Sequence, residues 1–158
     1  MKRLAVIIAL LSYCAQPAAA SPELAEAWGE KAGELYQTAL ALRDGAGETA
    51  GFEAEIARFS VTASRLAGWI DHEGGPADLG CIFRGMAAEA ESQLEALDAG
   101  KTAVALERLT LMFSDAELVS AAAIQAVSRE TQHVGAGAGV ETCRTRPMAR
   151  RQYFTEQP

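Results

Sequence analysis

The sequence contains few aromatic residues, which make up only 6% of its 158 residues, and it has only five prolines and 14 glycines. All-β sandwiches and barrels depend on aromatic and β-branched side chains, so this scarcity argues against them. With 49% hydrophobic residues, the composition also argues against collagen-like and disordered chains. Alanine, the best helix former, is abundant instead, at 33 residues or about one in five. The length suits one domain with a hydrophobic core.

The sequence also lacks an apolar run long enough to span a bilayer, which takes about 20 residues. A positive start at residues 1–3 precedes apolar residues 4–15, and three alanines follow at 18–20. This order of charge, apolar run and small residues is typical of a cleaved signal peptide. We therefore predict cleavage after Ala20 and export of residues 21–158 with no transmembrane anchor.

Lysine is scarce, with three lysines against 11 arginines, and with the alanine surplus this bias indicates a GC-rich bacterial genome. The expected location is therefore the periplasm or the exterior of the cell. After the predicted cleavage the chain keeps 12 basic and 21 acidic residues, a net charge of −9. Residues 144–158 carry +3 of this charge and the remainder carries −12. Because an acidic body repels nucleic acid, we expect no nucleic-acid partner.

Four stretches place apolar side chains at helical spacing and are separated by glycine, aspartate and proline, which favours helices over residues 21–44, 52–70, 76–97 and 101–133. The third carries Leu79, Ile82, Phe83 and Met86 in its apolar stripe. Short loops between amphipathic helices indicate an all-α fold, an antiparallel four-helix bundle over residues 21–134. A glycine-rich link and a basic tail would follow, over residues 135–158.

The fourth stretch contains a signal for a break. Ser114 and Glu117 have the spacing of a capping box, and Phe113 and Leu118 are placed to form a hydrophobic staple around it. A helix that stopped and restarted at Ser114 would give five helices instead of four.

Two cysteines, Cys81 and Cys143, remain once Cys14 is removed with the signal peptide. In an oxidising compartment such a pair is most simply a disulfide. The bundle topology brings the start of the third helix and the end of the fourth to the same end. We therefore predict a Cys81–Cys143 disulfide that tethers the tail.

The sequence has only two histidines, His72 and His133. His72 lies between Asp71 and Glu73, and His133 should end the fourth helix near the same end of the bundle. Imidazoles and carboxylates bind transition metals. A metal-binding bundle that uses His72, His133, Asp71 and Glu73 is therefore the alternative functional interpretation.

No pattern indicates catalysis, since the sequence has no G-x-S-x-G, no H-E-x-x-H and no phosphate-binding glycine motif. Cys143 is not part of a C-x-x-C-H haem attachment motif, because Arg144 follows it and no cysteine lies three residues before it. Four acidic residues recur along the first helix as a solvated face: Glu23, Glu26, Glu30 and Glu34. We expect neither an enzyme nor a cofactor.

Protein binding is therefore the expected function, and two segments contain the candidate contacts with a partner. Gly80 and Gly85 lie inside the third helix, where each costs about 1 kcal/mol relative to alanine and so indicates close packing or a contact. The candidate partner surface combines this segment with the tail: Phe83, Arg84, Arg150, Arg151, Tyr153 and Phe154. The sequence thus predicts an exported, non-catalytic bundle that binds an unidentified protein or forms a homo-oligomer.

Overall fold

The computed structural model describes residues 20–46 and 51–130. These residues form four α-helices and no strand, which confirms the all-helical prediction for this part of the chain. The helices are α1 (Pro22–Arg43), α2 (Phe52–His72), α3 (Ala77–Asp98) and α4 (Thr102–Glu130). The predicted signal peptide and the tail lie outside the described residues.

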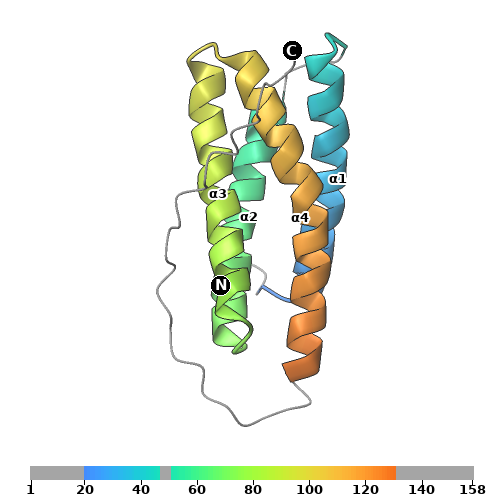
Figure 1. The fold of residues 1–158 in the computed structure, drawn as a ribbon, viewed down its shortest axis with the longest axis vertical. Coiled ribbons are helices and arrows are strands. Elements are labelled where there is room, and N and C mark those ends of the chain that lie inside the picture. Colours follow the sequence, from blue (N-terminus) through green and yellow to red (C-terminus); the bar gives the residue numbers. More distant parts are fainter. Residues whose placement is uncertain (1–19, 47–50, 131–158) are drawn as a thin grey trace, which may run out of the picture.

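The helices run alternately up and down (Figure 1). The most extensive contacts join α1 to α4 and α2 to α3, while α3 with α4 and α1 with α2 pack less closely. The α2–α3 connection and the last turn of α4 therefore lie at the same end of the bundle (Figure 1). None of the four helices is long and apolar enough to cross a membrane.

The helix ends follow the sequence signals closely. The Leu24 N–H donates a 3.3 Å hydrogen bond to Ser21 Oγ, and Pro22 occupies the first helical position. Gly74 and Gly100 adopt left-handed conformations, with φ of 75° each, and each lies two residues after the last residue of α2 or α3. Glycine reaches this region without the strain of a Cβ, so these two residues set the sharp turns that keep the helices antiparallel.

The five-helix alternative, with a break at Ser114, is wrong, because α4 continues through Ser114 as one helix of 29 residues. Ser114 is exposed. Phe113 is buried whereas Leu118 is 73% exposed, so Phe113 and Leu118 do not form the expected hydrophobic staple. A buried stripe of Leu109, Phe113 and Ala116 runs through the expected break. The burial of this stripe favours a continuous helix more than the local cap favours a restart.

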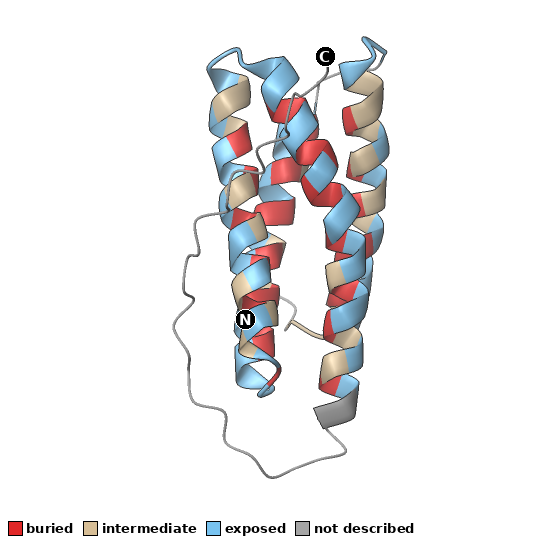
Figure 2. Ribbon diagram, viewed as in Figure 1, coloured by how far each residue is buried: buried red, intermediate tan, exposed pale blue. Residues whose placement is uncertain are grey.

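One aromatic ring from each helix meets in the centre of the bundle. Trp28 stacks on Phe59 with ring centroids 4.5 Å apart and meets Phe83 edge to face at 5.2 Å. Phe59 meets Phe113 edge to face at 5.1 Å. The Trp28 indole N–H donates a 3.2 Å hydrogen bond to the Phe59 carbonyl. These ring contacts join the four helices to one another. Figure 2 shows buried residues on each of the four helices.

Alanine fills the remaining core. Ala25, Ala32 and Ala39 are fully buried at seven-residue intervals on α1, and Ala116 and Ala123 are fully buried at the same interval on α4. Such small side chains let two helix backbones approach closely. The alanine surplus of the sequence therefore has a structural role at the α1–α4 contact.

Candidate interaction surface

The predicted metal ligands lie at the end of α2 and are not gathered into a site. His72 is exposed, with its Nδ1 3.3 Å from Glu73 Oε1. Asp71 is held elsewhere, because its Oδ2 accepts a 2.7 Å hydrogen bond from Arg84 Nη1. Within residues 20–46 and 51–130 no three His, Cys, Asp or Glu side chains are placed to hold a metal ion. His133 lies outside the described residues, so the metal site stays a prediction.

The predicted partner surface needs a correction at Phe83. Its side chain is fully buried and belongs to the aromatic centre, so the prediction that it contacts a partner is wrong. Arg84 is exposed and pairs with Asp71, which joins α3 to α2, and its contact with a partner stays a prediction. The other members of the predicted surface, Arg150, Arg151, Tyr153 and Phe154, lie outside the described residues.

Cys81 lies in the second turn of α3 and is half-buried. Its Sγ is 3.7 Å from Arg84 Nη2 and takes part in a disulfide. Cys143 lies outside the described residues, so its identity as the partner stays a prediction. The adjacent Gly80 is buried, and a Cβ there would come within 2.6 Å of Asp71 Oδ1. Gly80 thus lets α3 approach α2 closely, whereas Gly85 faces open space.

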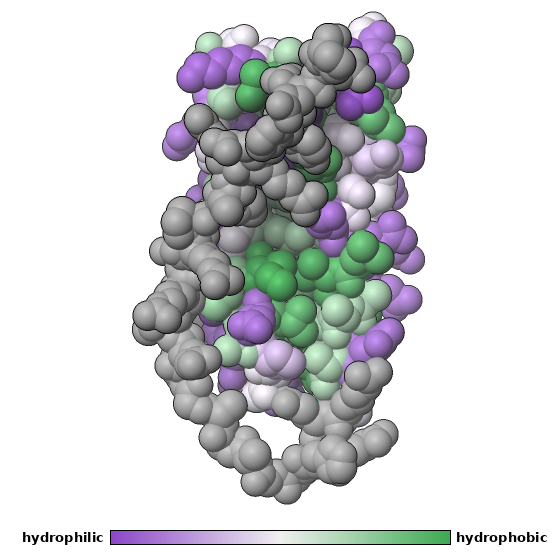
Figure 3. Space-filling view, in the orientation of Figure 1, coloured by the Kyte–Doolittle hydropathy of each residue, from purple (hydrophilic) through white to green (hydrophobic). Residues whose placement is uncertain are grey.

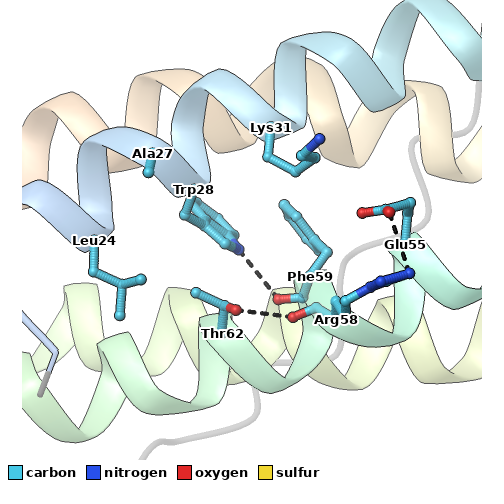
Figure 4. A pocket seen from close by; sticks show the side chains of 8 residues that line it. All are labelled: Leu24, Ala27, Trp28, Lys31, Glu55, Arg58, Phe59 and Thr62. Atoms are coloured by element: carbon cyan, nitrogen blue, oxygen red, sulfur yellow. Dashed lines mark hydrogen bonds and ion pairs between the residues drawn. The ribbon is translucent and has the colours of Figure 1, made fainter. Parts of the chain in front are cut away.

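A shallow groove of about 210 Å³ lies between α1 and α2, with Trp28 and Phe59 among its lining residues (Figure 4). All of its charged and polar lining side chains form ion pairs or hydrogen bonds. Lys31 pairs with Glu34, Arg58 pairs with Glu55 at 3.2 Å, and Thr62 Oγ1 donates to the Arg58 carbonyl at 2.9 Å. The lining has no nucleophile beside a base, so the groove has no arrangement suited to nucleophilic catalysis.

Two ionisable groups on α1 have shifted pKa values, and both are exposed. The pKa of Glu23 is lowered mainly by its hydrogen bond with the Ser21 side chain. The pKa of Lys31 is raised by its hydrogen bond with Glu34. Both shifts come from helix-surface contacts, so neither marks a buried catalytic group.

The feature of the described surface that is best suited to binding is an apolar face shared by α3 and α4. Arg108 Nε of α4 donates a 2.9 Å hydrogen bond to Glu89 Oε1 of α3, which fixes the sides on which these helices face each other. Ile82 and Met86 lie two turns and one turn before Glu89 on that side of α3, next to Leu79. On α4, Val119 and Ala126 lie three and five turns after Arg108 and therefore on the same side of the helix as Arg108.

These residues form the α3–α4 face, whose members are Leu79, Ile82, Met86, Val119, Ala122 and Ala126. Ile82 is 41% exposed, Leu79, Met86 and Val119 are half-buried against the core, and Ala122 is exposed. Figure 3 shows apolar surface gathered over α3 and α4 in the half of the bundle where α3 begins and α4 ends. The face is therefore continuous with the core and open to contact.

The sequence did not directly indicate this face, because Leu79, Ile82 and Met86 fall in the apolar stripe that is expected to form the core side of the third helix. A signal was present in the spacing of Phe83, Ala87 and Ala90, which alternates four and three as a buried seam does and leaves Ile82 outside it. Alanine at two of these positions made the buried seam less apparent than the larger residues beside it. No known protein family, curated protein or solved structure matches this chain significantly.

Proposed function

We propose that this protein is an exported, non-catalytic helical bundle that binds another protein through the α3–α4 face. The observation that carries the proposal is the exposure of Ile82 amid half-buried apolar residues from two helices. Contiguous apolar surface on a soluble domain marks an interaction site more often than isolated exposed residues do. Its neighbours Leu79, Met86 and Val119 pack on the core, which would hold the surface in a fixed shape for a partner.

The geometry of the face suits an amphipathic helix as the binding element of the partner. Leu79 and Met86 of α3 and Val119 of α4 all pack on the core as half-buried apolar residues, and an apolar surface of this kind can bind a third helix through its apolar stripe. The partner helix would place its anchors against Ile82 and Met86 on one side and Val119 on the other. Self-association through the same face is the other outcome that the proposal allows.

Export is part of the proposal and has its own check. N-terminal sequencing of the protein recovered from the bacterial envelope should begin at Ser21. Recovery of the intact N-terminus in the cytoplasm would contradict export.

Site-specific photo-crosslinking tests the binding surface. A benzophenone amino acid is placed at Ile82 in the full chain, and the matched control carries it at Val61, an exposed β-branched residue of α2 that is 61% exposed. Illumination in the native compartment should give one adduct of defined mass at position 82 and none at position 61. An adduct of twice the chain mass would indicate self-association. Equal labelling at the two positions would refute the proposal, and so would the absence of an adduct at both positions in chains with and without residues 144–158.

A further inference from the structure

Two acidic residues flank the α3–α4 face. Asp78 lies one turn before Ile82 on α3, and Asp115 lies one turn before Val119 on α4. Both are exposed, and neither forms an ion pair with another described residue. By contrast, Glu89, further along the same side of α3, is paired with Arg108. The face therefore combines an apolar centre with two acidic residues at its edge, which no other described residue neutralises.

The chain itself contains a segment with the complementary composition. Twenty-eight residues follow Glu130, at the end of the bundle where α3 begins. Residues 144–158 carry a net charge of +3, and only Gln152 separates Arg150 and Arg151 from the aromatic pair Tyr153 and Phe154. These are the side chains that an apolar surface with an acidic rim would bind.

We propose that residues 144–158 dock on the α3–α4 face of the same molecule and compete there with the partner. This inference rests on the proposed function, because it assigns a regulatory role to the same face. Tyr153 and Phe154 cover Ile82 and Met86, and Arg150 and Arg151 neutralise Asp78 and Asp115. The tail is thus an autoinhibitory segment.

The chain is long enough for this contact. Twenty-three residues separate Glu130 from Tyr153 and can span up to about 76 Å when extended. The part of α3 from Leu79 to Met86 is only about 10 Å long. If Cys143 is the disulfide partner of Cys81, ten residues separate the tether from Tyr153, which still reach about 33 Å. A tether of either length gives an effective concentration in the millimolar range, so weak intrinsic affinity is enough for docking.

Charge favours the tail over a second copy of the bundle. A symmetric dimer through this face would bring two sets of Asp78 and Asp115 together, because the same patch meets itself across a two-fold axis. The body of the chain carries −12, so this contact would be repulsive at low salt. The tail brings the opposite charge and lowers the repulsion.

Methionine-methyl NMR tests the contact on the unmodified protein. Only Met86, Met112 and Met148 follow the predicted cleavage site, and Met86 lies on the face. Nuclear Overhauser contacts between the Met86 methyl and the rings of Tyr153 or Phe154 are expected, at every protein concentration if the contact is intramolecular. Absence of such contacts, or their appearance only on concentration, would overturn the proposal.

Oxidation of Met86 gives an independent readout. The variant Tyr153→Ser with Phe154→Ser should let peroxide oxidise Met86 several-fold faster, while buried Met112 reports that the core is intact. The matched control, Gln152→Ser with Thr155→Ser, changes the same number of tail residues and should leave the rate unchanged. An equal Met86 rate in all three proteins would contradict docking.

The two proposals fail in different ways. If the tail does not dock but crosslinking at Ile82 still captures a partner, the autoinhibitory role is wrong and the binding function stands. If the tail docks but its removal leads to no adduct at Ile82, the docking stands and the binding function is wrong. If both hold, the tail variant should raise the yield of partner adduct several-fold.

Discussion

Gly29 of α1 lies so close to Ser120 of α4 that a Cβ added at Gly29 would come within 2.8 Å of Ser120 Cβ. The Ser120 hydroxyl also donates a 2.6 Å hydrogen bond to the Ala25 carbonyl, one turn before Gly29. A hydrogen bond and a missing side chain thus bring the two backbones together. This contact explains why α1 and α4 form one of the two most extensive helix pairs.

The close approach predicts that Gly29→Ala destabilises the bundle even though alanine is the better helix former. The new methyl would force α1 and α4 apart or displace Ser120, at a cost of about 1–3 kcal/mol in the free energy of unfolding. Urea denaturation followed by circular dichroism measures this loss in the free energy of unfolding.

Gly33, one turn further along α1, is the matched control. A Cβ there would meet nothing within 4 Å, so Gly33→Ala should stabilise the protein by up to about 1 kcal/mol. Equal effects of the two substitutions would show that the α1–α4 contact is looser than described.

The adjacent residues Ile82 and Phe83 should respond oppositely to truncation. Phe83 is fully buried in the aromatic centre, so Phe83→Ala should lower the free energy of unfolding by about 3–5 kcal/mol. Ile82 is 41% exposed, and Ile82→Ala should cost well under half of that. Thermal and urea denaturation of the two variants measure the loss in the free energy of unfolding. A larger loss for Ile82→Ala would mean that the helix is rotated from its described position.

Ile82 and Phe83 also show which features of the fold could be predicted from the sequence. The number of helices and their ends were predictable, because glycine, proline and the Ser21 cap act locally. The rotation of α3 was not, since Ile82 and Phe83 are both large apolar residues and only contacts with other helices choose between them. The same limit applies at Ser114, where the sequence has the pattern of a capping box. The burial of Leu109, Phe113 and Ala116 along the same helix outweighs that pattern.

The predicted Cys81–Cys143 disulfide should hold in the purified protein. Mass spectrometry after alkylation should find both cysteines blocked until a reductant is added, and peptide mapping should join them to each other. The linkage closes a loop of about 60 residues, so its reduction should lower the stability by at most roughly 4 kcal/mol. Free thiols at both positions before reduction would contradict the pairing.

Metal content separates the binding module from its alternative. Because Asp71 is bonded to Arg84 and His72 is exposed, we expect protein purified without a histidine tag to contain no stoichiometric transition metal. Elemental analysis measures it. One metal ion per chain, lost in His72→Ala and retained in Glu30→Ala on the solvated face of α1, would establish the metal-binding alternative.

We propose above all that α3 and α4 together form one binding surface. The most direct measurement places the benzophenone at Ala122 of α4 and adds a charge on α3 by Ile82→Glu, with Val61→Glu as the matched control. If the proposed surface is correct, Ile82→Glu abolishes the partner adduct at Ala122 and Val61→Glu leaves its yield unchanged. An adduct that survives Ile82→Glu at the yield of the control would contradict the account.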